Sequence, residues 1–347
     1  MKALVVPKPG EARIENVPEP SLEQSPLGDY QALVRIKASS ICNSTDTQIL
    51  TGRFPMDWLD GQQYPGILGH EGVGEVVKLG KKVTAFKEGD HVFRPRAEVQ
   101  GLGCFFGSFA EYGLVTDYRA LLQDHPETPV HFNWPMQQVI PGDVDPYLAP
   151  VLINLKECYS ALRNIGVRWE SSVLVMGAGG VGLGFTAMAK LHGVRDVITV
   201  GRRDERLEMA RGFGADHTIN TTKENLRDRV MEITGGKGVD FIIEATGDAS
   251  LYIELCRVLA TDGKMGVYGI NNLQEFPLSM RHMPPSFWFG CLAPDEPAAH
   301  KSMMDFVRLG IVKPEQWATH TVSLEEAPEA FKHVKDSEVV KIVVKVA

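Results

Sequence analysis

The 347-residue chain carries 36 Lys and Arg against 44 Asp and Glu, which gives a formal net charge of −8 at pH 7. This acidic balance argues against nucleic acid as a main partner, because binding a phosphate backbone requires a basic face. The length exceeds what one core usually holds, so two domains are expected. The chain has no apolar run of the roughly 18 residues that a membrane span needs.

The first twenty residues lack the apolar segment of a secretory signal, so none is predicted. The five cysteines are odd in number and widely spaced, which argues against a disulfide framework; they are Cys42, Cys104, Cys158, Cys256 and Cys291. We therefore expect a protein of the reducing cytoplasm.

Taken in chain order, the first 125 residues are predicted to be rich in strands. Short apolar runs at 32–38 and 72–80 are broken by Gly, Pro and Asp, as is typical of β structure. Residues 125–146 are rich in proline and predict a loop that approaches a domain boundary. Residues 147–166 then show helical spacing and end at a glycine.

Strands and helices alternate from residue 172 onward. Strands are expected within 172–180, 196–201, 217–220, 239–247 and 263–269, and helices at 181–193, 203–214, 226–236 and 250–260. This alternation predicts an α/β fold with a parallel, doubly wound sheet. The last part, 314–347, is predicted to form a strand, a helix and a strand.

A glycine-rich turn lies between the first strand and helix of this series. Gly177, Gly179 and Gly182 stand in G-x-G-x-x-G order. Gly177 permits a tight turn, Gly179 leaves room for a pyrophosphate, and Gly182 allows close packing of helix and strand. Gly180 and Val181 open a helix whose free N–H groups and dipole favour phosphates. The sequence therefore predicts a dinucleotide cofactor here.

The end of the second strand bears on which dinucleotide is bound. An acidic residue there would hydrogen-bond the ribose of NAD, but this chain has Gly201, followed by Arg202 and Arg203. The glycine removes a charge that would repel a 2′-phosphate, and guanidinium groups suit phosphate recognition. This predicts NADP; the alternative is that both arginines only solvate a surface turn.

Two N-terminal segments carry possible metal ligands, "SSICNSTDTQILTG" (39–52) and "YPGILGHEGVGEVVKLG" (64–80). With "EGDHVF", "GSFAEY", "SALRNIG", "GAGGVG", "GADHTIN", "IIEATG" and "SLEEAPEAF", they make the chain resemble the zinc-type medium-chain dehydrogenase/reductase family. The resemblance implies a GroES-like β-barrel catalytic domain over 1–150 and 300–347. It also implies a Rossmann domain over 151–299, hydride transfer between alcohol and carbonyl, and a homodimer or homotetramer.

The resemblance implies that Cys42 and His70 ligate a catalytic Zn²⁺ and that Glu71 lies beside the metal, directly or through water. Thr45, with Ser44 as competitor, would relay the substrate proton. In the same way, Asp46 would orient His70. Gln48 stands where many members have a relay histidine, and Thr246 is expected to contact the cofactor.

The chain also departs from the family pattern. Cys42 lies one residue further upstream than usual. Ile153, which cannot bind a metal, occupies the usual place of a third ligand, so Glu157 is the candidate instead, because residues four apart share a helix face. Asn154 and Lys156 could bond a polar substrate, and Lys156 could serve as an acid–base group if zinc were absent. The region that holds a four-cysteine structural zinc in many members has Cys104 alone, so at most one zinc is predicted.

The polar residues Asn43, Gln48, Asn154, Lys156 and Glu157 favour a substrate with several hydroxyls, such as a polyol, sugar or cyclitol. Apolar walls could come from Trp58, Trp134, Phe287 and Trp288. Two alternatives stay open. One is a zinc-free NADPH-dependent quinone or enone reductase of the same superfamily, and the other is an NADPH-binding protein without catalytic activity.

Overall fold

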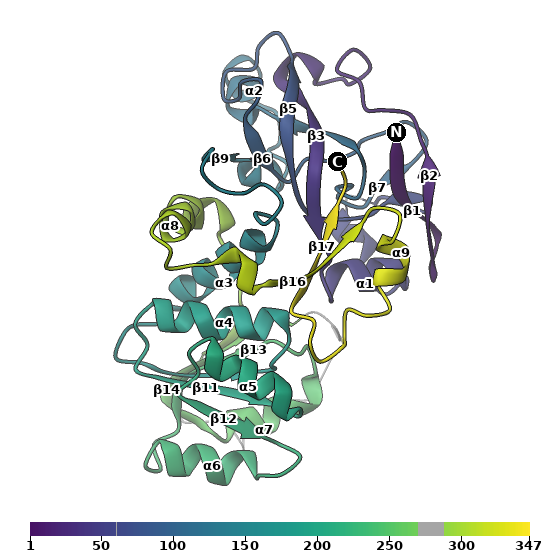
Figure 1. Cartoon of the computed structure of the whole chain (residues 1–347). Coiled ribbons are helices and arrows are strands. Elements are labelled where there is room, and N and C mark those ends of the chain that lie inside the picture. The colour runs from purple at the N-terminus through teal and green to yellow at the C-terminus, as the bar shows by residue number, and fades with distance from the viewer. Residues whose placement is uncertain (60, 270–287) are drawn as a thin grey trace. The chain divides into compact units, whose positions relative to one another are not determined.

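The computed structural model describes residues 1–59, 61–269 and 288–347, and the chain divides into two units (Figure 1). The first unit comprises Met1–Ile153 and His300–Ala347, and the second comprises Asn154–Ala299. Within the described ranges, no helix is both long and apolar enough to cross a membrane.

The larger sheet of the first unit pairs the C-terminal strands of the chain with strands from its first 140 residues. Its order is β16-β17-β3-β5-β6-β9, and β8 also pairs with β3, so the yellow C-terminal β17 lies beside the purple β3 in Figure 1. Alternate residues of β3 are buried and pack with β5, β6 and β8. The strands are β3 (Gln31–Ser40), β5 (Glu71–Leu79), β6 (His91–Phe93), β8 (Tyr112–Thr116), β9 (Val139–Ile140), β16 (Ala318–Ser323) and β17 (Lys341–Lys345).

A second sheet of the first unit has the order β2-β1-β4-β7. Its strands are β1 (Lys2–Lys8), β2 (Glu11–Asn16), β4 (Gly66–Ile67) and β7 (Gly103–Cys104). Three short helices belong to this unit, namely α1 (Thr45–Leu50), α2 (Tyr118–Asp124) and α9 (Ala327–Ala330). The chain passes between the units within α3 (Val151–Ile165) and α8 (Glu296–Arg308).

Asp117 caps the N-terminus of α2 and ties it to a neighbouring turn. Its carboxylate accepts from the N–H groups of Ala120 (3.1 Å), Thr84 (2.8 Å) and Ala85 (2.8 Å). Burial alone would raise the pKa of Asp117, but these donors outweigh that effect and lower the pKa. The buried carboxylate therefore stays charged and stabilises the start of the helix.

The second unit contains one parallel sheet of order β12-β11-β10-β13-β14-β15. Chain order reverses between β10 and β13, and in doubly wound sheets ligands bind at such a point. The strands are β10 (Ser172–Met176), β11 (Asp196–Gly201), β12 (His217–Asn220), β13 (Val239–Glu244), β14 (Leu259–Val267) and β15 (Trp288–Cys291). The helices are α4 (Gly180–Leu191), α5 (Asp204–Gly212), α6 (Leu226–Ile233) and α7 (Tyr252–Cys256).

Several element boundaries differ from the sequence prediction. The helix expected over 250–260 ends at Cys256, and β14 begins at Leu259, because Leu259 packs into the sheet core before a bulge at Asp262, which has φ 63°. The predicted loop at 125–146 contains a short 3-10 helix at Trp134–Met136 and the strand β9. The run at 72–80 that was predicted as β structure lies largely in the strand β5.

Candidate metal centre and cofactor site

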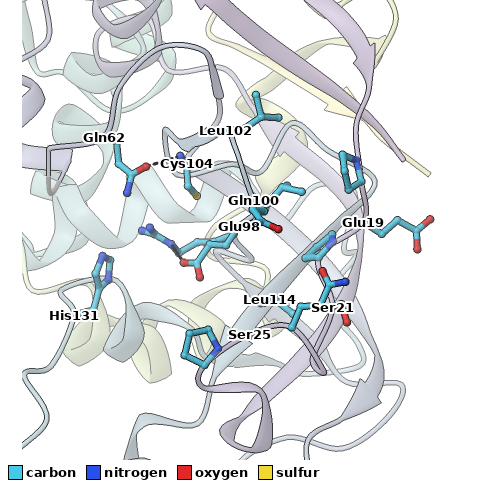
Figure 2. Close-up of a pocket in the computed structure, with 16 residues that line it drawn as sticks. Glu19, Ser21, Ser25, Gln62, Glu98, Gln100, Leu102, Cys104, Leu114 and His131 are labelled. Atoms are coloured by element: carbon cyan, nitrogen blue, oxygen red, sulfur yellow. Dashed lines mark hydrogen bonds and ion pairs between the residues drawn. The ribbon is translucent and has the colours of Figure 1, made fainter.

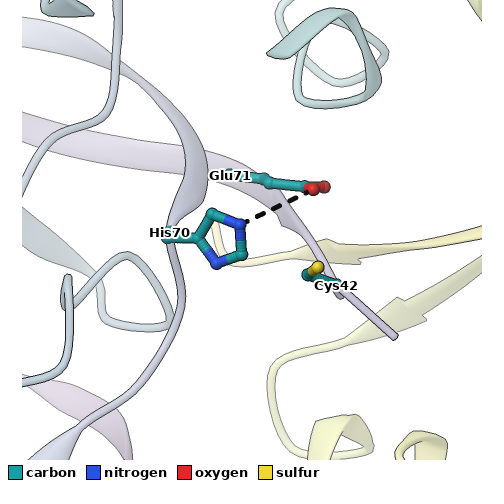
Figure 3. Close-up of side chains that lie close together, drawn as sticks. All are labelled: Cys42, His70 and Glu71. Atoms are coloured by element: carbon teal, nitrogen blue, oxygen red, sulfur yellow. Dashed lines mark ion pairs between the residues drawn. The ribbon is translucent and has the colours of Figure 1, made fainter. Parts of the chain in front are cut away.

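Three possible metal ligands meet in the first unit, where the end of β3 lies beside the start of β5. Ser40, the last residue of β3, pairs with Glu71, the first residue of β5. Cys42 follows β3 by two residues, and His70 precedes β5. The Cys42 sulfur, a His70 ring nitrogen and a Glu71 carboxylate oxygen lie within 4.8 Å of one another, and all three residues are buried (Figure 3).

Asp46 holds both His70 and the backbone of Cys42. His70 Nδ1 lies 2.9 Å from Asp46 Oδ1, and the N–H of Cys42 donates to Asp46 Oδ2 over 2.9 Å. A carboxylate only accepts, so His70 carries a proton on Nδ1, and Nε2 is the ring nitrogen that a metal would bind in place of a proton. Burial alone would lower the pKa of His70, but Asp46 raises it. Thiolate, imidazole and carboxylate are zinc ligands, so these residues fit a zinc ion.

Glu71 also forms an ion pair with Lys341, a residue that the sequence analysis missed. Lys341 Nζ lies 2.5 Å from Oε1 and 2.6 Å from Oε2 of Glu71, and the Ser40 hydroxyl donates to the same carboxylate. Burial alone would raise the pKa of Glu71, but Lys341 and His70 lower it. A lysine at the start of a terminal strand is usually exposed, and only the pairing of β17 with β3 brings Lys341 here.

The two candidate relay hydroxyls lie at the start of α1. The Ser44 hydroxyl accepts from Gln48 Nε2 at 3.1 Å, and Thr45 is the first helical residue; both are half-buried. Asn43 Nδ2 donates to the Val334 carbonyl over 2.6 Å. Two side chains expected to meet a polyol, Asn43 and Gln48, therefore already bond within the first unit.

Helix α3 places the remaining predicted polar residues. Lys156 is fully buried, and its Nζ lies 2.7 Å from Glu296 Oε1, so this lysine is paired with a carboxylate, and its role toward substrate stays a prediction. The Tyr268 hydroxyl donates to Glu157 Oε2 over 2.9 Å. Ile153 is fully buried. Over the described ranges, the one group of side chains that could hold a metal does not include Glu157, whose assignment as a ligand stays a prediction.

The glycine-rich turn joins β10 to α4 in the second unit, and each of its glycines is favoured for a different structural reason. Gly177 has φ 114°, and a Cβ on it would lie 2.9 Å from Thr246 Cγ2. A Cβ on Gly182 would lie 1.8 Å from the Gly177 carbonyl oxygen, so no side chain fits there. Gly179 has no atom within 4 Å of such a Cβ. The N-terminal end of α4 is therefore open at Gly179, where the sequence predicts a pyrophosphate.

Two guanidinium groups follow the end of β11. A Cβ on Gly201 would lie 3.2 Å from Ala178 Cβ and 3.2 Å from Leu207 Cδ2, which leaves little room for an acidic side chain. Arg202 and Arg203 come next, are exposed, and directly precede α5.

Thr246 lies beside this turn and is held by Glu244, which the sequence analysis did not single out. Glu244 Oε1 accepts from the N–H groups of Thr246 (2.7 Å) and Gly247 (3.1 Å), and the Thr246 hydroxyl also donates to it. Burial raises the pKa of Glu244, and the N–H donors partly oppose that effect. The sequence did offer a signal for Glu244, because it ends a parallel strand and the carboxyl ends of such strands face bound ligands.

Comparison with known proteins settles the family. Residues 28–124 match the alcohol dehydrogenase GroES-like domain, and residues 180–306 match the zinc-binding dehydrogenase domain. An alcohol dehydrogenase of Cupriavidus necator is 31% identical over 307 residues, which cover 78% of this chain and 76% of that protein. The chain belongs to the zinc-type medium-chain dehydrogenase/reductase family.

Further relatives of this dehydrogenase cover its whole length. A sorbitol dehydrogenase of Halalkalibacterium halodurans is 26% identical over 361 residues, which cover 99% of this chain and 98% of that one. The solved alcohol dehydrogenase TADH from Thermus sp. ATN1 is 25% identical, with a TM-score of 0.81 and full coverage of both chains. The predicted fold, a Rossmann sheet with a GroES-like domain, is confirmed. Membership of the family implies a nicotinamide cofactor and a catalytic zinc.

A separate pocket of about 890 Å³ lies in the GroES-like unit, in the region where many dehydrogenases of this family hold a structural zinc. Glu98, Gln62, Cys104 and His131 line it (Figure 2). Arg96 Nε lies 2.9 Å from Glu98 Oε1, and the N–H of Cys104 donates to Gln62 Oε1 over 3.0 Å. Burial raises the pKa of Cys104 to about 11, so its sulfur stays a thiol.

The aromatic residues predicted as apolar walls differ in their exposure. Trp58 and Trp288 are exposed, Trp134 is half-buried, and Phe287 lies outside the described residues. The ring that packs on His70 is Phe106, whose centroid lies 5.2 Å from that of the imidazole.

Proposed function

We propose that this dehydrogenase is NADP-dependent and uses one zinc ion, held by Cys42, His70 and Glu71, to oxidise a secondary alcohol or to reduce the matching ketone. The observation that carries the proposal is the meeting of these three ligand atoms within 4.8 Å. The bond from Asp46 to His70 Nδ1 supports it, because that bond leaves Nε2 available.

A bound zinc ion would supply a Lewis acid that favours the deprotonated form of the alcohol. The protein's own groups do the rest. Asp46 keeps the His70 ring in one tautomer and orientation, and Lys341 balances the charge of Glu71. The Thr45 or Ser44 hydroxyl carries the alcohol proton toward solvent. A bound nicotinamide cofactor would accept the hydride of the carbinol carbon, so that loss of a proton and a hydride would leave a ketone.

Glu157 is retained in this proposal as a candidate further ligand. It lies four positions after Ile153 on α3, and residues four apart share one face of a helix. The Tyr268 hydroxyl bonds one of its oxygens, and a carboxylate has lone pairs for a second partner.

The start of α4 supports a dinucleotide cofactor, and the end of β11 supports the choice of NADP over NAD. The open side of Gly179 and the first N–H groups of α4, at Gly180 and Val181, suit a pyrophosphate. Arg202 and Arg203 suit a 2′-phosphate. A charge-assisted hydrogen bond contributes about 1.5–3 kcal/mol, so losing one such bond corresponds to roughly a 10- to 100-fold lower affinity for NADP.

The substrate class in this proposal is a polyol, sugar or cyclitol, and it is supported by the sorbitol dehydrogenase among the relatives. The side chains themselves support it less than the sequence suggested. Asn43, Gln48 and Lys156 bond within their own units, which leaves fewer groups to bind substrate hydroxyls. A homodimer or homotetramer in the cytoplasm is proposed from the family likeness, and light scattering would measure the assembly.

One experiment tests metal, cofactor and substrate class together. Protein purified without chelator is analysed for zinc and assayed with polyols, sugars and cyclitols, with NADP and NAD side by side. The proposal predicts about one zinc per chain, faster turnover with NADP, and loss of both zinc and turnover in Cys42→Ala. A zinc-free protein that reduces enones or quinones with NADPH is the rival enzyme. NADPH binding without turnover of any alcohol or carbonyl indicates the inactive protein.

A further inference from the structure

We propose that Arg94 is a positioning residue that fixes the His70–Glu71 segment and so tightens the hold on the metal. The inference rests on the proposed metal centre and deepens it. Arg94 follows β6, is only 5% exposed, and has a φ of 55°, which is uncommon for a residue other than glycine.

Arg94 donates two hydrogen bonds to the backbone on either side of Glu71. Its side-chain Nη1 donates to the His70 carbonyl over 3.0 Å, and its backbone N–H donates to the Gly72 carbonyl over 2.8 Å. The carbonyl groups of the two residues that flank Glu71 are thus held by one residue. Since His70 and Glu71 are consecutive, a rotation of this backbone would turn both proposed ligand side chains away from Cys42.

The left-handed backbone of Arg94 is itself held in place. Its carbonyl accepts from Gln137 Nε2 at 3.0 Å and from Asn133 Nδ2 at 3.3 Å, and both amides are buried. Gln137 Oε1 accepts from the Thr116 N–H over 2.8 Å, which ties the same amide to the end of β8. Strained conformations persist where surrounding bonds over-determine them, and they gather at functional sites.

Three residues hold different parts of His70. Asp46 sets the tautomer of the ring, Phe106 packs against the ring, and Arg94 holds the main chain from which the ring projects. Groups that orient metal ligands typically change metal affinity by about 10- to 100-fold when they are removed. Arg94 makes no metal contact in this account and acts only through His70 and Glu71.

Arg96 is a matched control on the same stretch of chain. It lies two residues further on, is similarly buried at 9% exposure, and pairs with Glu98. Its backbone bonds with Leu114, on β8. Loss of its guanidinium therefore removes a buried cation beside the pocket of Figure 2, together with its pairing to Glu98.

The test measures zinc release from the intact protein without using catalysis. Wild type, Arg94→Met, Arg94→Lys and Arg96→Met are loaded with zinc, and release to a chromogenic chelator is timed well below each melting temperature. We expect release about 10- to 100-fold faster in Arg94→Met, an intermediate rate in Arg94→Lys, and a rate within about twofold of wild type in Arg96→Met. Cobalt-substituted Arg94→Met should also show altered d–d absorption.

Release from Arg94→Met within about twofold of wild type overturns the inference, and so does equally fast release from Arg96→Met, which would mark a general loss of stability. If Arg94→Met does not fold, Arg94→Lys is compared with Arg96→Lys, and equal rates overturn the inference. A wild-type protein that retains no zinc would overturn the proposed metal centre, whereas retained zinc with unchanged release in the Arg94 variants removes only the part assigned to Arg94.

Discussion

A single added methyl group should have opposite effects at two glycines of the cofactor turn. Gly179 has φ −77° and ψ −178°, an extended conformation open to any residue, and nothing lies near its added Cβ. Gly182 would place the methyl group 1.8 Å from the Gly177 carbonyl oxygen and 2.8 Å from its carbon. We expect Gly179→Ala to lose cofactor and keep its stability, and Gly182→Ala to lose stability.

The magnitudes follow from these surroundings. Replacing a glycine by alanine where the backbone permits it stabilises a protein by about 0.4–1 kcal/mol. The methyl group on Gly179 would occupy the approach of the pyrophosphate. Loss of one or two charge-assisted bonds to it costs about 2–4 kcal/mol, or roughly a 30- to 700-fold weaker affinity. At Gly182 the obstacle is backbone, so the turn must move, at a cost of about 1–3 kcal/mol or more.

Thermal melts and titration of NADPH fluorescence separate the two effects. Gly179→Ala should melt at or slightly above the temperature of wild type while its NADPH affinity collapses. Gly182→Ala should melt several degrees lower. Unchanged NADPH affinity in Gly179→Ala would refute the placement of the pyrophosphate at this turn, and a large fall in its melting temperature would refute the argument from open space.

Three further predictions concern cofactor choice, acid stability and a buried ion pair. Arg203→Ala should weaken NADPH binding about 10- to 100-fold and leave NADH binding nearly unchanged; an equal loss for both cofactors would contradict a 2′-phosphate contact. Asp117→Asn should lower the free energy of unfolding by about 1–3 kcal/mol at pH 7. Because the pKa of Asp117 is lowered in the folded protein, its stabilisation is present above pH 4 or so and is lost as the pH falls through the folded value. The difference in unfolding free energy between wild type and Asp117→Asn, measured in denaturant melts, should therefore shrink below about pH 4. A difference that does not change with pH would contradict this prediction. Lys156→Met should cost about 3–5 kcal/mol by leaving Glu296 buried without its cation, and adding Glu296→Leu should recover much of that loss; no recovery would exclude the ion pair as the cause.

The Rossmann part of the fold was predictable because its signals are local. Alternating strands and helices with a glycine turn between the first pair specify a parallel sheet, and the roles of Gly177, Gly179 and Gly182 follow from backbone sterics alone. The end of α7 was predicted too late because an apolar residue such as Leu259 suits both a helix and a strand. Only the packing of the sheet core decides that it belongs to a strand.

The metal candidates were found through residue type and family likeness, but their surroundings were not. Lys341 reaches Glu71 across 270 residues of sequence, through the pairing of β17 with β3. Arg94 donates to the His70 carbonyl from a left-handed backbone conformation that no sequence pattern signals. The pairing of Lys156 with Glu296 was missed because a helix pattern shows a polar residue without showing what lies opposite it. Such pairs depend on tertiary contacts that no local pattern encodes.

The central claim is that Cys42 and His70 hold a zinc ion, and X-ray absorption at the zinc edge tests it most directly. Wild-type protein should bind about one zinc per chain, with a sulfur neighbour at about 2.3 Å and nitrogen and oxygen neighbours at about 2.0–2.2 Å. In Cys42→Ser the sulfur signal should disappear and the zinc content should fall. A wild-type protein without zinc, or with zinc surrounded by oxygen and nitrogen alone, would contradict the account.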